Sequence, residues 1–262
     1  MSIPLFFLSN EYLLEELIVT PGCLRLKSKG YFFKKIAEDD LLVLRSLIQT
    51  QYISRLGNLG LAADKLTSSS ICAYHLNSHL LNHEETWPKH ERLLSRESVK
   101  LIRNCNFIAS LSKDFGEFQI SDEEKLDREN IYWRLVRPGV ATDVGPMHAD
   151  AWFWELSDSK IPTNMARVKV WIAIHCEKGQ SGFRFVEKSH LSKFPYKGEF
   201  RDGKLKPQIE IDERKLKIKL FESEPGDAII FHDRLLHGGA LGGTETRVSL
   251  EFTMLVKENA AG

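Results

Sequence analysis

The chain lacks net charge and long apolar runs. Lys plus Arg and Asp plus Glu both number 36 among 262 residues, so the formal net charge is zero. A neutral chain has no overall field that would attract nucleic acid or an anionic membrane. No apolar run approaches the roughly 20 residues that a transmembrane helix needs. We therefore expect neither a nucleic-acid partner nor a membrane partner.

Cysteine is scarce, and no leader segment is recognisable. The four cysteines lie far apart, without a C-x-x-C pair. Such spacing is typical of free thiols in a reducing compartment rather than of a disulfide framework. The apolar run at residues 5–8 follows Met1 without a basic stretch, so a signal peptide is not expected. These features predict a cytoplasmic protein.

The first half of the chain, residues 1–129, has mainly helical patterns. Apolar residues recur near the helical period, and capping residues or helix breakers bound the segments. The expected helices begin at Ser9 or Asn10 and end at Ile18, or span residues 37–56, 68–85 and 95–112.

The second half, residues 130–256, has strand patterns separated by turns. Residues 215–221 alternate strictly, with Leu216, Ile218 and Leu220 on one face. Further strands are expected at residues 131–136, 167–176, 228–232 and 247–256. The order predicts a mainly β fold with flanking α-helices, in which a helical half packs outside a β sandwich or jelly roll. No repeat or low-complexity linker divides the chain, and 262 residues suit one core, so we expect a single domain over residues 1–262.

Three residues form a candidate metal site. His148 and Asp150 are two positions apart, so a strand would point both side chains to one face. His237 follows a predicted strand 87 residues after Asp150 and would complete the set. Two imidazoles and one carboxylate, with the opposite face open, are the ligands of non-haem Fe(II) oxygenases.

Arg247 and Ser249 form a candidate anion site. They share one face of the last strand, opposite Val248 and Leu250. A buried guanidinium needs an anionic partner, and the far carboxylate of a dicarboxylate cosubstrate would suit its fork.

Several motifs occur in an order that resembles a known family. They are His148-x-Asp150, residues 170–174, residues 181–190, Pro225-Gly226-Asp227, His237 and Arg247. Over residues 130 to 256, they resemble phytanoyl-CoA dioxygenase-like Fe(II)/2-oxoglutarate oxygenases. The chain departs from the family where Glu187-Lys188-Ser189-His190 replaces a Gly-x-x-x-x-Pro-Gly-Ser-His run.

The resemblance implies a fold, a cofactor and a reaction. The fold would be a double-stranded β-helix, with Fe(II) on His148, Asp150 and His237. 2-Oxoglutarate would chelate the iron, anchored by Arg247 and assisted by Ser249, and O2 would be the second cosubstrate. The products would be succinate, CO2 and an oxidised substrate. Similar members that halogenate carry Ala or Gly in place of Asp150, so this chain is expected to carry out hydroxylation or a related oxidation rather than chlorination.

Other histidines compete for these roles. His232 is an alternative to His237, which the following Gly-Gly and the spacing to Arg247 favour. His75, His79 and His83 recur every four residues, as in a zinc-binding helix, but a polar, solvated helix face is the better interpretation.

Five residues are candidates for the substrate or cosubstrate pocket. Trp152 follows the metal pair and would wall a cavity, whereas its neighbour Phe153 is expected in the core. The other four lie on predicted strands: Arg134, Lys169, Trp171 and His175. Arg134 and Lys169 could equally face solvent, whereas His175, on the same face as Trp171, would either line the barrel or be a hydrogen-bonded strand histidine.

The expected substrate is a small polar or anionic metabolite, such as a natural-product, sugar or amino-acid derivative. Residues 188–219 hold ten Lys or Arg and five Asp or Glu, in a hairpin or lid that would attract an anion or merely be solvated. Two alternatives are a cupin-like metal-binding protein without turnover and a metal-dependent isomerase that does not use 2-oxoglutarate.

Overall fold

A computed structural model describes most of the chain. The described residues are 20–60, 66, 68–157, 161–179, 182–201, 204–241 and 243–257. The helix expected to end at Ile18 lies outside them.

The centre of the fold is a large antiparallel sheet. Its strand order is β1-β9-β4-β11-β2, and β3 also pairs with β11. The bounds are β1 Tyr31–Lys35, β2 Phe118–Ile120, β3 Tyr132–Val136, β4 Met165–His175, β9 Asp227–His232 and β11 Arg247–Lys257. β1 and β2 come from the half that the sequence predicted to be helical, so this half contributes two strands as well as helices.

A smaller sheet and a hairpin complete the β structure. The smaller sheet has the order β10-β5-β8, and β6 pairs with β7 as a separate hairpin. The bounds are β5 Phe183–Val186, β6 Tyr196–Arg201, β7 Lys204–Ile209, β8 Ile218–Phe221 and β10 His237–Gly239. The hairpin predicted within residues 188–219 is thus confirmed. The strand predicted at 215–221 is shorter, because a 3-10 turn at Glu213–Lys215 occupies its start.

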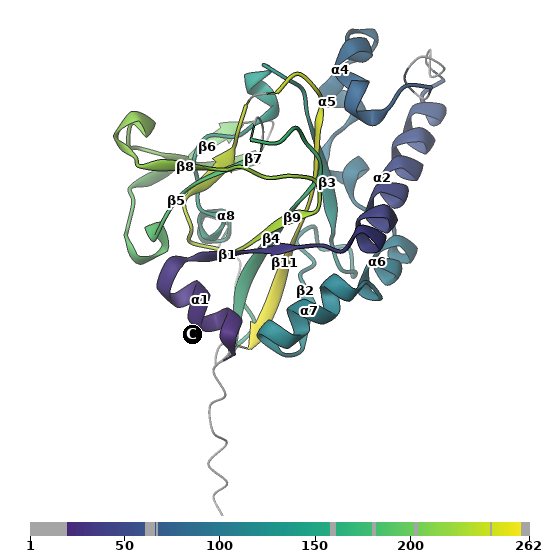
Figure 1. Ribbon diagram of the computed structural model, residues 1–262. Helices are drawn as coiled ribbons and strands as arrows, with labels where there is room; N and C mark the ends of the chain where they lie inside the picture. The colour runs from purple at the N-terminus through teal and green to yellow at the C-terminus, as the bar shows by residue number, and fades with distance from the viewer. Residues whose placement is uncertain are drawn as a thin grey trace, which may run out of the picture.

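Longer helices cover one face of the large sheet. They are α1 Pro21–Lys29, α2 Glu38–Asn58, α6 Arg96–Arg103 and α7 Asn106–Phe115. Figure 1 shows α2, α6 and α7 along one side of the sheet, and β5 and β8 on the other. The helix predicted at 95–112 is broken: α6 ends before Asn104, and α7 starts after Cys105. Asp40 binds the free N–H groups of Asn106 and Phe107, so a tertiary contact caps the second helix.

The helix predicted at 68–85 is also broken into short pieces. They are η1 Ile71–Ala73, α4 Tyr74–Asn77, η2 Ser78–Leu80 and α5 His83–Thr86, followed by η3 Lys89–Arg92. Leu81 is extended, and the Asn82 side chain caps a new turn by accepting from the N–H groups of Glu84 and Glu85. The three histidines at four-residue spacing therefore do not share one helix face.

The two faces of the large sheet differ in chemistry. Along β4, Val168, Val170, Ile172 and Ile174 are buried against the helices in the largest core cluster. Their neighbours point the other way, where Trp171 and Ala173 join a second cluster with the smaller sheet. The alternating side-chain directions of one strand therefore build two separate layers.

These layers confirm the predicted fold class. The molecule has a double-stranded β-helix core of antiparallel strands, with the helical part packed on it. Within the described residues, no helix is both long enough and apolar enough to cross a membrane.

Candidate metal centre and anion site

Two distant segments of the chain meet at the smaller sheet, where His237 begins β10. His148, Asp150 and His237 offer ligand atoms that all lie within 4.8 Å of one another, and they are the only such group in the described part of the chain. Asp150 Oδ1 is 3.8 Å from His148 Nε2, and Asp150 Oδ2 is 3.6 Å from His237 Nε2. The expectation that His148 and Asp150 share a strand is wrong. Asp150 is the first residue of helix α8, Asp150–Leu156, so the strand-to-helix turn brings it beside His148.

The backbone fixes both imidazoles. His148 and His237 form an isolated bridge in which each N–H donates to the other carbonyl at 2.8 Å. The Nδ1 of His148 lies 2.9 Å from the Pro146 carbonyl, and the Nδ1 of His237 lies 2.8 Å from the Leu235 carbonyl. A carbonyl only accepts, so each Nδ1 carries the proton and each Nε2 presents its lone pair to the centre. This arrangement is typical of metal-binding histidines.

The charge states of the three residues also suit a metal. Burial, reinforced by His237, lowers the pKa of His148 to about 4, and burial also lowers the pKa of His237. Burial raises the pKa of Asp150, but Lys169 and the two imidazoles outweigh it and hold this pKa at about 2. At neutral pH the centre is therefore two neutral imidazoles and one carboxylate, which is the form that binds divalent iron.

Aromatic rings hold the histidines from the sides. Phe183 stacks on His237 with ring centroids 5.0 Å apart, and Phe231 meets the same ring edge-on at 4.7 Å. Phe153 contacts His148 edge-on at 5.4 Å and is 37% exposed, so its predicted place in the core is wrong. Trp152 is buried and stacks on Tyr196 of the hairpin, with centroids 4.5 Å apart. In α8, Trp152 is thus the buried ring of the two, and Phe153 is the ring beside a candidate metal ligand.

Arg247 and Ser249 lie on the inner face of β11. Both are buried, and Arg247 Nε and Ser249 Oγ have no hydrogen-bond partner among the described side chains and backbone. The Arg247 guanidinium lies over the Trp171 ring, 5.6 Å from its centroid. Burial, and then the charge of Arg134, lower the pKa of Arg247 to about 10. A buried cation with free donors favours the binding of an anion, because leaving it unpaired costs about 3 kcal/mol.

Arg134 lies on β3 directly beside Ser249 in the sheet register. Its Nε is 3.5 Å from Oε1 of Glu251, and 39% of its side chain is exposed. Glu251 shares a face with Arg247 and Ser249, and strand parity alone could have identified it as part of this site.

The remaining candidates take different places. Lys169 is buried on β4, and its Nζ is 3.6 Å from Asp150 Oδ2. Trp171 is buried below Arg247 and contacts Phe183. His175 ends β4, where burial, and then Arg45 of α2, lower its pKa to about 4.

The competing histidines stand apart from the centre. His232 ends β9, and its Nδ1 is 3.1 Å from Asp233 Oδ1 and accepts from the Arg234 N–H. His83 packs on Tyr74, whereas His75 Nδ1 lies 3.0 Å from Thr246 Oγ1. None of these three histidines belongs to the candidate metal-binding group found among the described residues.

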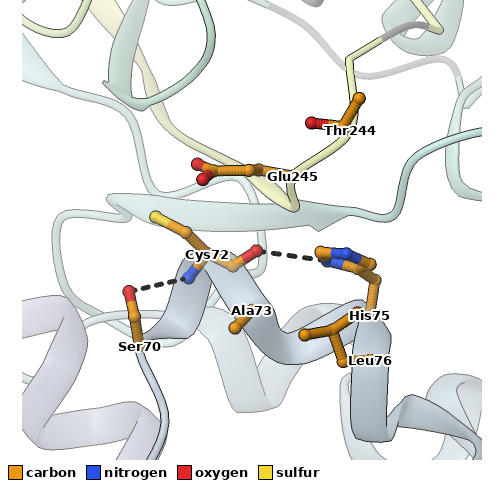
Figure 2. Close-up of a pocket in the computed structure, with 7 residues that line it drawn as sticks. All are labelled: Ser70, Cys72, Ala73, His75, Leu76, Thr244 and Glu245. Atoms are coloured by element: carbon orange, nitrogen blue, oxygen red, sulfur yellow. Dashed lines mark hydrogen bonds between the residues drawn. The ribbon is translucent and has the colours of Figure 1, made fainter.

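A surface pocket also lies away from the centre. It has a volume of about 380 Å³ and is formed by η1 and α4 together with the loop before β11. Figure 2 shows Cys72 and His75 on the helical side, facing Glu245 and Thr244 on the loop. Its lining includes none of the three clustered residues.

The site and the fold define a class: a jelly-roll protein with two histidines and one carboxylate at a candidate metal centre. Residues 108–244, more than half of the chain, match the family model described as Phytanoyl-CoA dioxygenase (PhyH). The chain belongs to this family. No curated protein matches the sequence.

Solved structures share the fold at low sequence identity. EvdO2 from Micromonospora carbonacea var. aurantiaca, complexed with 2-oxoglutarate, is 10% identical with a TM-score of 0.53, covering 90% of this chain and 89% of that chain. The non-heme alpha-ketoglutarate-dependent carbocyclase SnoK from nogalamycin biosynthesis is 12% identical with a TM-score of 0.52, covering 91% and 85%. The non-heme monooxygenase ThoJ is 11% identical with a TM-score of 0.52, covering 90% and 77%. At these identities the likeness shows the fold alone.

Proposed function

We propose that this protein is an Fe(II)- and 2-oxoglutarate-dependent dioxygenase that hydroxylates a small polar or anionic metabolite. One observation carries the proposal: His148, Asp150 and His237 converge, while buried Arg247 and Ser249 keep unpartnered donors on the adjoining strand face. Family membership and the 2-oxoglutarate bound to EvdO2 support it.

The residues divide the work as follows. The Nε2 atoms of His148 and His237 and the carboxylate of Asp150 would hold Fe(II). When bound, iron and 2-oxoglutarate supply the oxidising chemistry: O2 delivers one oxygen atom to succinate and one to the substrate, and CO2 is released. Arg247 and Ser249 would hold the far carboxylate of 2-oxoglutarate, and Trp171 supports the guanidinium from below. Arg134, partly exposed beside Ser249, is the candidate to bind an anionic group of the substrate.

The test is metal- and cosubstrate-dependent turnover. Apoprotein would be loaded anaerobically with Fe(II) and 2-oxoglutarate, and the charge-transfer absorption of the chelate recorded. After O2 is admitted, succinate would be measured with and without candidate metabolites. We expect the absorption band and succinate with wild type, and neither with His237→Ala.

Two results would favour the alternatives. Iron binding without succinate under every condition would indicate a metal-binding protein that does not turn over. Metal-dependent conversion of a substrate that is indifferent to 2-oxoglutarate would indicate an isomerase.

A further inference from the structure

A buried lysine contacts the carboxylate of the candidate metal centre. Lys169 lies in the middle of β4 and is only 4% exposed. Its Nζ donates to Thr253 Oγ1 at 2.7 Å and to Glu123 Oε1 at 3.2 Å, and it lies 3.6 Å from Asp150 Oδ2. Its three N–H donors thus face three oxygens from three segments: β11, the loop after β2, and α8.

The charge of Lys169 would by itself weaken metal binding at this centre. An ammonium group next to a divalent cation opposes the binding of that cation. Glu123 supplies a compensating negative charge, and Lys89 approaches its other oxygen at 3.6 Å. Because the Lys169–Glu123 pair is neutral overall, the three ligands keep their own net charge of one negative. The pair can therefore act on Asp150 through geometry and local hydrogen bonding rather than through net charge.

The carboxylate of Asp150 has two equivalent ways to bind. Its Oδ1 lies nearer His148 Nε2, and its Oδ2 lies 3.6 Å from His237 Nε2. Binding through both oxygens would consume a coordination position that the open face of a two-histidine, one-carboxylate centre needs. Lys169 removes the equivalence, because Oδ2 is the carboxylate oxygen nearest its Nζ, at 3.6 Å.

We propose that Lys169, oriented by Glu123 and Thr253, is a positioning residue. It binds Oδ2 of Asp150, so that this carboxylate coordinates the metal through Oδ1 alone. The inference rests on the proposed function only in requiring that a divalent metal binds this centre. Groups that orient metal ligands change affinity by about 10- to 100-fold when they are removed.

The first experiment measures Mn(II) affinity without turnover. Lys169→Met alone would leave the half-buried Glu123 with only one of its two lysine contacts, so the main variant is Lys169→Met with Glu123→Gln, which removes both charges together. We expect its Mn(II) Kd to rise about 10-fold or more, with a folded circular dichroism spectrum. The matched control is Lys89→Gln, which removes a charge next to Glu123 but no contact to Asp150, and we expect its Kd to stay at the wild-type value. A Kd in the double variant that is unchanged or lower would overturn the proposal.

The second experiment needs no variant. In a crystal structure of wild type loaded with Mn(II), we expect Oδ1 of Asp150 on the metal and Oδ2 within hydrogen-bond distance of Lys169 Nζ. Coordination by both oxygens, or by Oδ2, would refute the positioning role. If wild type and Asp150→Ala both fail to bind Mn(II), the metal centre of the proposed function fails instead, so the two failures are distinguishable.

Discussion

The two faces of the large sheet are built from the same strands and serve different ends. On β11, Val248, Leu250 and Phe252 point to the helices and lie in the main core cluster. On the other face of the same strand, Arg247, Ser249 and Glu251 each hold a buried polar atom without a hydrogen-bond partner among the described groups. One face therefore stabilises the fold, whereas the other leaves buried polar atoms without hydrogen bonds, at a cost to stability.

The largest expected effect comes from the apolar face. Phe252 is fully buried, so Phe252→Ala removes its contacts and leaves a cavity. We expect a loss of about 3–5 kcal/mol in the free energy of unfolding, measured by urea titration. The change one residue earlier, Glu251→Gln, keeps size and shape and leaves no cavity, so we expect a smaller loss than for Phe252→Ala. Equal losses would show that the apolar face contributes no more to the free energy of unfolding than the polar face.

A second change tests the site face through the cosubstrate. Arg247→Gln should raise the KM for 2-oxoglutarate about 100-fold, because loss of one partner of a buried charge pair costs about 2–5 kcal/mol. The same variant should melt no lower than wild type without ligands, since it removes a buried charge with a free donor. Succinate assays and melting curves measure the two effects. The control is Arg214→Gln, in an exposed pair with Asp212. A normal KM in Arg247→Gln would place the cosubstrate elsewhere.

The smallest expected effect is on the pH dependence of stability, to which buried histidines on both sides of the sheet contribute. Burial lowers the pKa of His83, which packs on Tyr74 on the helical side, to about 4, as it does for His148 at the centre. The unfolded chain takes up these protons first, so stability is full above pH 6.5 and falls as the pH drops toward 4.

His83→Gln should remove one of the protons that the chain takes up on unfolding between pH 6.5 and 4. We expect the slope of unfolding free energy against pH to become shallower by about 1.4 kcal/mol per pH unit in that window. Denaturant titrations from pH 7 to 4 measure it, with the exposed His90→Gln as control. An unchanged slope would mean that His83 has the same pKa in the folded protein as in the unfolded chain.

Much of the fold was open to prediction because its determinants are local. The alternation in β11 predicted which residues share its apolar face, and the same parity placed Arg247 and Ser249 together on the opposite face. Helix breaks were missed where distant groups decide them, as where Asp40 caps α7. β1 was missed for a similar reason, since it becomes a strand by pairing with β9, far along the chain.

The sequence by itself determined the donors: two imidazoles, a carboxylate, a guanidinium and a hydroxyl, each beside a turn or on a given strand face. Only the tertiary structure decided how they meet. It joined His148 to His237 by a backbone bridge, started α8 at Asp150, and set Lys169 against that carboxylate. The reason is physical: side-chain alternation is a property of one strand, whereas distances between ligands depend on the pairing of strands far apart in the chain.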